Sequence, residues 1–490
     1  MYLCAFFFKN TNIMITFWIS LAVLVLGYVV YGAFTEKVFG IDTNRETPAT
    51  RLSDGVDYVP MKPWKLFLIQ FLNIAGVGPI CGAIMGAQFG TASYLWIVLG
   101  CIFGGAVHDY MSGMISLRED GASLPEIHGK YLGNGVKQFM RGFMVFLMIL
   151  VGVVFVNTPA QLLQSQFAPN MSVYVWVVVI LIYYMLATLL PIDKVIGKIY
   201  PIFGFLLIGM AVAIVAAFVI YRPEIPEIWE GMQNLNPNAA ANPIFPMMFI
   251  SIACGAVSGF HATQSTLVAR CMVNESQGRR IFYGAMIVEG IVALIWAAAA
   301  SYFYHDNPAL LSESGPAMVG IIANRWFPKA IAVVTILGVI SAAITSGDTA
   351  LRSCRLIVAD FMNIEQKSLS KRLWVAVPIF AVTAVFLVLS LAAPKGFAVV
   401  WQYFSWANQF LSAITLWAVT VYIARNKTGM YYLISLIPAL FMTMATTSFL
   451  LVSKTSLGSF MPRTAGYVIA AVFTAVTLAI FLRKEIVKKA

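Results

Sequence analysis

The chain has 490 residues, of which 60% are hydrophobic and 11% charged, with a mean hydropathy of +0.83. Soluble domains carry about 25% charged residues, so the composition excludes a soluble globular protein and indicates a polytopic membrane protein in a lipid bilayer. The net charge of +11 lies in short loops between apolar segments, which favours a role in membrane orientation over binding to nucleic acid.

The apolar segments predict an all-α protein with about thirteen transmembrane helices. Residues 12–34 are an extra N-terminal span, because they are longer than a signal-peptide core and lack a convincing cleavage site. Residues 35–63 form a long polar loop. The other predicted spans lie near 64–88, 92–116, 141–164, 172–190, 199–220, 244–265, 281–304, 330–349, 373–393, 397–423, 431–452 and 465–482. Residues 431–490 thus contribute two C-terminal helices and a short basic tail.

The distribution of Lys and Arg supports this topology. With thirteen alternating spans, one side of the membrane collects 25 of the 32 Lys and Arg residues and the other side collects the remaining 7. The positive side is cytoplasmic. We therefore expect the N-terminus outside, the C-terminus inside and the loop 35–63 in the cytoplasm.

Two of the spans are interrupted by helix-breaking residues. Gly76, Gly78 and Pro79 stand in the middle of the span at 64–88, and a second Gly-rich stretch covers 252–265. Broken helices are tolerated in a membrane only where they are buried in protein or line a polar cavity. Such a pair at matching positions is the best sequence indication of a secondary transporter's binding site.

The spacing of the broken helices predicts an inverted repeat. They are the second and seventh spans, so the unit at 64–220 and the unit at 244–423 enter the membrane from opposite sides. Each unit has five helices. This five-plus-five arrangement is typical of LeuT-like transporters.

Four motifs carry a family resemblance. Residues 47–60 (TPATRLSDGVDYVP), 74–79 (IAGVGP), 253–261 (ACGAVSGFH) and 274–275 (NE) resemble the carbon starvation protein A family over about residues 20 to 425. The resemblance implies a bacterial inner-membrane transporter of the amino acid–polyamine–organocation superfamily, associated with peptide uptake during carbon starvation. Some members are similar to proton-coupled pyruvate importers. Many members carry two adjacent histidines where this chain has Ile69 and Gln70, so a role of that pair is not carried over.

The backbone and polar groups at the two breaks are the candidate substrate-binding residues. They are Asn73, Ala75, Gly76 and Gly78 in the first broken helix, and Cys254, Gly255, Ser258, His261 and Gln264 in the second. Gln70 and Asn73 face the same cavity if the first helix opens toward it. The alternative is that the small residues only allow close helix packing.

Two carboxylates inside the spans are candidates for coupling. Glu289 lies in the eighth span with no neighbouring charge in the sequence. A carboxylate in the hydrocarbon costs several kcal/mol unless it is paired or protonated, which suits a proton carrier. The alternative is a structural hydrogen bond to another helix. Asp109 lies near the cytoplasmic end of the third span, and we expect a gate or ion pair there with Arg118 or Arg352.

The ninth span offers a site for a metal cation instead. Ala342, Thr345 and Ser346 resemble the place where sodium-coupled members of this superfold bind a cation against the first broken helix, here at Gly76. Hydroxyl and carbonyl oxygens are suitable hard ligands, and Asp348 adds a charge. The alternative is that the hydroxyls bond back to their own helix. Proton and sodium coupling therefore both remain open.

The sequence favours a transporter over other classes of protein. Motifs of hydrolases, metalloproteases and phosphate loops are absent, and the four histidines are too dispersed to suggest a metal cluster, so we expect neither an enzyme nor a cofactor. A nutrient sensor is the main alternative, but it should append a signalling domain, and only eight residues follow Leu482. A channel fits paired broken helices less well. The substrate is expected to be a small peptide or a short organic acid.

Overall fold

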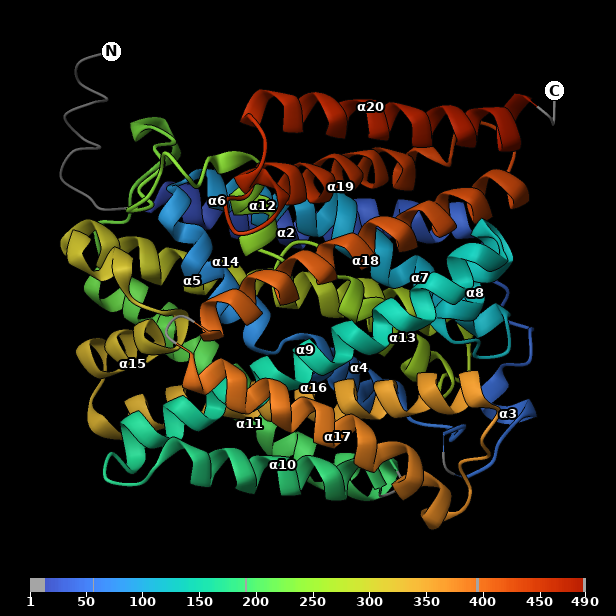
Figure 1. Ribbon diagram of the computed structural model, residues 1–490, viewed down its shortest axis with the longest axis horizontal. Helices are drawn as coiled ribbons and strands as arrows, with labels where there is room; N and C mark the ends of the chain where they lie inside the picture. The colour runs from blue at the N-terminus through green and yellow to red at the C-terminus, as the bar shows by residue number, and fades with distance from the viewer. Residues whose placement is uncertain (1–13, 56, 190–191, 394–395, 488–490) are drawn as a thin grey trace.

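The computed structural model describes residues 14–55, 57–189, 192–393 and 396–487, with the backbone alone at 192–199. The described part of the chain is 80% helix and contains no strand. Many of the long helices, α10, α17, α19 and α20 among them, run roughly along the long axis of the molecule, and others are inclined to it (Figure 1). Long runs of Leu, Ile, Val, Ala and Phe form helices here because a helix satisfies its own backbone hydrogen bonds, as lipid requires.

Within the described residues, ten helical segments are long and apolar enough to cross a membrane. They are α2 (Ile15–Phe39), α6 (Ala92–Leu99) continuing into α7 (Ala106–Arg118), α9 (Asn134–Phe167), α11 (Ile192–Tyr221), η5 (Glu275–Gln277) continuing into α14 (Gly284–Asp306), α16 (Lys329–Met362), α17 (Leu369–Ala392), α18 (Gly396–Asn426), α19 (Leu433–Val452) and α20 (Arg463–Phe481). The chain is therefore a multi-pass membrane protein.

Further helices extend this set. The bent pair α4 (Pro63–Ile74) and Gly78–Phe89 makes an eleventh span. Helix α10 (Val173–Leu189) is apolar but has 17 residues. The short helices α12 (Ile244–Ser251) and α13 (Gly259–Ala269) make up the seventh predicted span. The thirteen-span count and the inverted repeat stay predictions.

Three short α-helices among the described residues lie outside the predicted spans. They are α3 (Pro48–Arg51), α8 (Leu124–Leu132) and α15 (Gly315–Trp326). Helix α3 falls within the stretch 35–63 that we expect to be a loop, and α2 extends five residues into that stretch, to Phe39. The C-terminal cap of α2 is Gly40, which adopts a left-handed conformation at φ 71°.

Helix α16 is the clearest departure from the predicted boundaries. It continues to Met362, although the sequence predicted an end at Thr349. Arg352 and Arg355, which indicate a loop in the sequence, are buried with exposures of 1% and 2%. The side chain of Arg352 donates to the carbonyl of Ala187 and that of Arg355 donates to Gln366. Because these charges have partners within the protein, the helix does not have to end before them.

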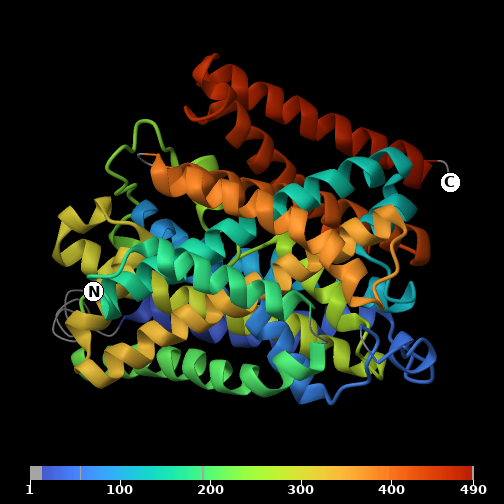
Figure 2. The same cartoon turned by 60° about the horizontal axis from the view of Figure 1, so that its bottom comes forward.

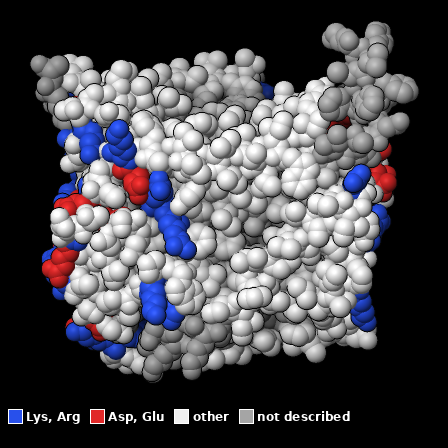
Figure 3. Space-filling view, turned by 180° about the vertical axis from the view of Figure 1, so that it is seen from behind, with Lys and Arg blue, Asp and Glu red and all other residues white. Residues whose placement is uncertain are grey.

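The charged residues gather at the two ends of the bundle. Figure 3 shows a wide band without charged side chains between them, and most of the Lys and Arg side chains in this view lie at one edge. Helices α19 and α20 lie on one flank, outside the main bundle (Figure 2). In the most apolar stretch of α20 only 17% of the residues are buried inside the protein. In the corresponding stretch of the η5–α14 segment 89% of them are buried. Helix α14 is therefore central, while α20 presents most of its surface to lipid.

Candidate functional site

The first broken helix bends by 51° between α4 and Gly78–Phe89. Helix α4 ends at Ile74, Ala75 caps it through a hydrogen bond to the carbonyl of Phe71 (2.8 Å), and the helix resumes as η1 (Gly78–Gly82) and α5 (Ala83–Gly86). Gly76 is required by a close approach, because a Cβ atom there would lie 2.5 Å from Oγ of Ser346. The break expected from the glycines and the proline is present.

The second broken helix is interrupted over residues 252–258, between α12 and α13. The side chain of Asn408 on α18 supports this break. Its Oδ1 accepts hydrogen bonds from the backbone N–H of Phe260 (3.1 Å) and from Oγ of Ser258 (3.3 Å). A side chain from another helix thus satisfies one of the free N–H groups that begin α13.

The two breaks touch one another. A Cβ atom at Gly78 would lie 2.3 Å from Sγ of Cys254, and one at Gly255 would lie 3.7 Å from Cα of Pro79. At Gly78 only a hydrogen atom leaves room for the second break, whereas the distance from Gly255 to Pro79 is an ordinary van der Waals contact. The two broken helices therefore meet at their interruptions.

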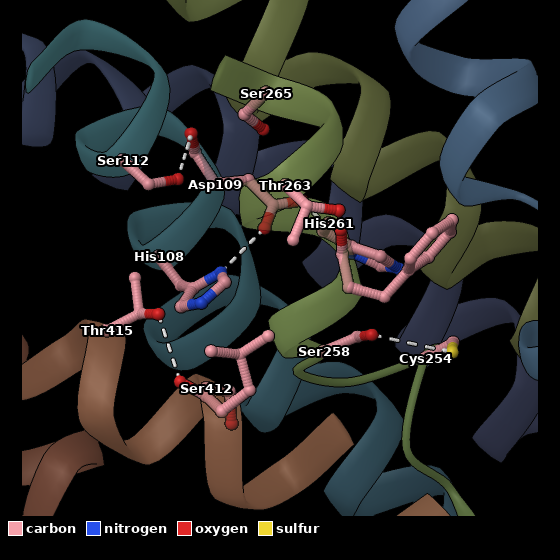
Figure 4. Close-up of polar contacts among 12 residues, drawn as sticks. His108, Asp109, Ser112, Cys254, Ser258, His261, Thr263, Ser265, Ser412 and Thr415 are labelled. Atoms are coloured by element: carbon pink, nitrogen blue, oxygen red, sulfur yellow. Dashed lines mark hydrogen bonds and ion pairs between the residues drawn. The ribbon is translucent and has the colours of Figure 1, made fainter. Parts of the chain in front are cut away.

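Four fully buried residues, His108, Asp109, His261 and Glu289, form what we call the buried histidine cluster, beside the second break. Figure 4 shows the first three of them. Asp109 on α7 accepts from both histidines: Oδ1 lies 2.8 Å from Nδ1 of His108, and Oδ2 lies 3.1 Å from Nδ1 of His261. On the other side of the His261 ring, Nε2 lies 3.4 Å from Oε1 of Glu289 on α14. His261 stands in the first turn of α13, directly after the break.

Nε2 of His261 and Oε1 of Glu289 lie within ion-pair distance, but they do not form a hydrogen bond. Both oxygens of Glu289 and Nε2 of His261 lack a hydrogen-bond partner among the described residues. One histidine between two fully buried carboxylates can hold a proton for either of them, and an unpaired buried charge is costly. The buried histidine cluster is therefore suited to bind and release a proton.

The predicted partners of Asp109 are wrong. Arg118 binds Glu275 through Nε (3.0 Å) and Nη2 (2.8 Å), and Arg352 donates to Ala187. Asp109 instead faces the two histidines. His261 is 152 residues away from Asp109 along the chain, and the packing of α7 against α13 brings the two side chains together. The sequence near Asp109 therefore did not indicate this partner.

Thr345 and Ser346, two residues of the predicted cation site, contact Leu72 where α16 packs against α4; no hydrogen bond joins them to the predicted Gly76 carbonyl. Oγ1 of Thr345 and Oγ of Ser346 donate to the carbonyl of Leu72, at 2.9 and 3.3 Å. Thr345 also donates to its own helix, at the carbonyl of Ala342 (3.0 Å). The oxygens that would bind a sodium ion are thus close together, but their hydroxyl hydrogens have protein acceptors.

The other predicted residues face different neighbours. Oδ1 of Asn73 accepts from the hydroxyl of Tyr200 (3.2 Å). Gln264 donates to Ser353 (3.3 Å). Gln70 donates to Ser265 (3.0 Å), so Gln70 and Asn73 do not share their hydrogen-bond partners. Both carboxylate oxygens of Asp348 lack a hydrogen-bond partner in the described part of the chain.

Sequence reasoning missed the polar face of α18. Trp401, Ser405, Asn408, Ser412 and Thr415 are all buried and recur at helical spacing. In Figure 4, Ser412 and Thr415 lie on the α18 side of His108. The signal was present, because five polar or amphipathic residues at intervals of three and four mark one face of a helix. It lay outside the Gly-rich stretches on which the prediction of the site depended.

The fold is shared with known transporters. The structure matches a manganese transporter of Eremococcus coleocola with a TM-score of 0.53 and 11% identity, covering 88% of this chain and 97% of that chain. It matches a Na+-coupled sialic acid symporter with a TM-score of 0.51 and 18% identity, covering 95% and 97%. At these identities the likeness concerns the fold alone. The LeuT-like helical architecture expected from the sequence is confirmed.

Several relatives resemble the chain in sequence. A Haemophilus influenzae protein described as an uncharacterized membrane protein is 44% identical over 349 residues, covering 61% of this chain and 94% of the relative. The peptide transporter CstA of Bacillus subtilis is 26% identical, covering 91% of each chain. The pyruvate/proton symporter BtsT of Escherichia coli is 29% identical, covering 59% of this chain and 50% of the relative.

The family model described as carbon starvation protein CstA matches residues 12–175, 160–326 and 316–449. These ranges include both broken helices, the buried histidine cluster and the polar face of α18. The two relatives with a described activity are transporters and not enzymes. The chain belongs to the carbon starvation protein CstA family.

Proposed function

We propose that this protein is a secondary active transporter that imports a small nutrient, a peptide or a pyruvate-like carboxylate, across the bacterial cytoplasmic membrane. Its relatives include peptide transporters and a pyruvate/proton symporter, and its fold is that of transporters. The membership of the carbon starvation family supports a role when carbon is scarce. The N-terminus lies outside and the C-terminus inside.

The observation that carries the proposal is the position of His261. This residue stands at the start of α13, next to the break that meets the first broken helix, and contacts carboxylates from α7 and α14. When the cluster gains or loses a proton, the attraction that holds α13 to those two helices changes. Such a change links the charge of the cluster to the position of a broken helix, as proton-coupled transport requires.

The candidate coupling residues are therefore Asp109, His261 and Glu289 for a proton. A sodium ion is the second candidate, supported by the convergence of Thr345, Ser346 and the carbonyls of Leu72 and Ala342. We favour the proton, because the hydroxyl hydrogens at the second position point at the same carbonyl oxygens that would have to bind the ion. Substrate is expected at the two breaks, where Gly76, Gly78, Cys254, Gly255 and Ser258 bring their backbones together.

The test is uptake into proteoliposomes that contain the purified protein. Labelled pyruvate and a labelled dipeptide are offered under an imposed proton gradient, an imposed sodium gradient, or neither. We expect accumulation above the external concentration only with the proton gradient. A protein that binds a substrate but never accumulates it under any gradient would be a nutrient sensor, and the proposal would fail.

A further inference from the structure

Three buried hydrogen-bond donors on one side of α18 have no acceptor. They are Nε1 of Trp401, Oγ of Ser405 and Nδ2 of Asn408, and none has a hydrogen-bond partner among the described residues. The three residues are 4%, 2% and 0% exposed. Their spacing of four and three residues places them on one helix face, which we call the α18 donor face.

The orientation of the Asn408 amide is fixed by its neighbours. Its oxygen accepts from the N–H of Phe260, which can only donate, so the other end of the amide must be the NH2 group. Trp401 has a donor and no acceptor in its side chain. Two of the three groups can therefore be satisfied only by an acceptor, and the Ser405 hydroxyl can donate as well.

A cavity of about 220 Å³ adjoins this face. Trp401 and Ser405 line it from α18, Met85 and Gln88 line it from the second half of the first broken helix, and Ile250 and Ser251 line it from the end of α12. The walls of the cavity thus come from both broken helices and from α18. Asn408 is not part of the cavity lining; it follows Ser405 by three residues on the same helix face and contacts Ser258 at the second break.

One part of the cavity wall is made of amides. Asn236 donates to Gln88 (3.1 Å), and Asn242 donates to Asn236 (3.0 Å). None of the lining residues is Asp, Glu, Lys or Arg. An anion entering the cavity therefore meets amide and hydroxyl groups without electrostatic repulsion from a neighbouring carboxylate.

These observations define the chemistry of the ligand. Buried donors without acceptors favour a ligand rich in acceptor oxygens, and a carboxylate presents the largest number for its size. Pockets for drug-sized ligands measure about 300–1,000 Å³. The smaller volume here suits an acid of a few carbon atoms better than an extended peptide.

We propose that the α18 donor face binds the carboxylate of a short organic acid, which enters through the cavity beside Trp401 and Ser405. The inference rests on the proposed transport function, chooses the carboxylate over the peptide, and adds the residues that bind it. The acid would lie between the two broken helices and α18, with its oxygens directed at Ser405 and the NH2 group of Asn408.

The experiment removes one donor at a time. Trp401→Phe keeps an aromatic ring and loses the N–H group, and Ser405→Ala loses the hydroxyl. Binding of pyruvate is measured by thermal stabilisation of the full-length protein in detergent, and uptake is measured in proteoliposomes. We expect each change to weaken the apparent affinity for pyruvate about tenfold or more, since a hydrogen bond to a charged group is lost.

Two matched controls separate this effect from a general loss of packing. Trp406→Phe makes the same change on α18, where the indole N–H donates to Thr446 (3.2 Å) and lies outside the cavity lining. Thr335→Val removes another fully buried hydroxyl, on α16, that has no hydrogen-bond partner within the described part of the chain. Both controls should keep the affinity for pyruvate within about twofold of the unaltered protein, because neither removes a donor from the cavity.

A third variant tests the part of the site that lies at the second break. Asn408→Asp keeps an oxygen that can accept from Phe260 and replaces the NH2 donor by an oxygen that repels an anion. Pyruvate binding should be lost while thermal unfolding in the absence of ligand stays cooperative. If Asn408→Asp fails to fold, Trp401→Phe and Ser405→Ala still decide the question.

The outcomes distinguish this inference from the proposed function. Unchanged pyruvate affinity in Trp401→Phe and Ser405→Ala would overturn the α18 site and leave transport standing. Accumulation of the dipeptide without binding of pyruvate would also overturn the inference alone. Binding of pyruvate without accumulation of either probe would overturn the transport function and keep the site. Neither binding nor accumulation would overturn both.

Discussion

At the scale of single residues, the most consequential contact is the one between His261 and its two carboxylates. Glu289→Gln keeps the shape of the side chain and removes the group that can release a proton. We expect this variant to lose accumulation of substrate under a pure proton gradient, because the cluster can no longer cycle between two charges. Exchange of substrate across the membrane without a gradient should continue.

The control for Glu289→Gln is Glu126→Gln, which alters a partly exposed carboxylate that pairs with Arg141 (2.8 Å) and Lys137 on α9. Proton-driven accumulation in Glu126→Gln should match the unaltered protein. Normal accumulation by Glu289→Gln would show that this carboxylate does not carry the driving proton.

The hydroxyls of Thr345 and Ser346 give the competing prediction. Replacing both by Ala removes their hydrogen bonds to the carbonyl of Leu72, which contribute about 0.5–1.5 kcal/mol each. We expect a modest fall in melting temperature with proton-driven accumulation retained. The opposite result has two parts: uptake by the unaltered protein depends on sodium, and this uptake disappears in the double variant. That result would assign coupling to Thr345 and Ser346.

At the scale of elements, the two broken helices can approach each other closely because Gly78 has no side chain. Gly78→Ala would place a methyl group 2.3 Å from Sγ and 2.5 Å from Cβ of Cys254, so the two half-helices must move apart. Overpacking of this kind costs about 1–3 kcal/mol. We expect lower thermal stability and slower uptake.

A second change tests whether this clash is the cause. Cys254→Gly removes the atoms that the new methyl group would meet, so Gly78→Ala combined with Cys254→Gly should recover part of the lost uptake. Gly142→Ala is the matched control, because a Cβ atom there meets nothing within 4 Å. Equal losses in Gly78→Ala and Gly142→Ala would show that the close approach is unimportant.

The sequence predicted the elements better than their partners. Gly76, Gly78 and Pro79 weaken a helix through their own covalent structure, so the first break is predictable from local chemistry. The partner of Asp109 depends on which face of α7 packs against α13, and nothing near Asp109 in the sequence specifies that contact. The α18 donor face was missed for a related reason, since its polar residues acquire meaning only beside the cavity formed by other helices.

At the scale of the whole molecule, Lys and Arg side chains gather at one edge (Figure 3). This asymmetry predicts that this edge faces the cytoplasm when the protein lies in the membrane. A cysteine introduced at Ala309, an exposed residue of the short helix η7 (Pro308–Ser312) after α14, should react with an impermeant thiol reagent in intact cells. A cysteine in the tail at Lys488 and Lys489, outside the described residues, should be protected until the membrane is opened. The opposite pattern would overturn the thirteen-span topology.

Besides capping a helix, Asn408 connects the site proposed for the acid with the site proposed for the proton. Its oxygen holds Ser258 and Phe260, and the next residue is His261, so the proposed acid site and the proposed proton site are separated by a single turn of backbone. Free energies around a closed cycle must balance, so coupling between two ligands is reciprocal. Whatever factor a proton on the cluster adds to the affinity for the acid, the acid adds to the affinity for the proton.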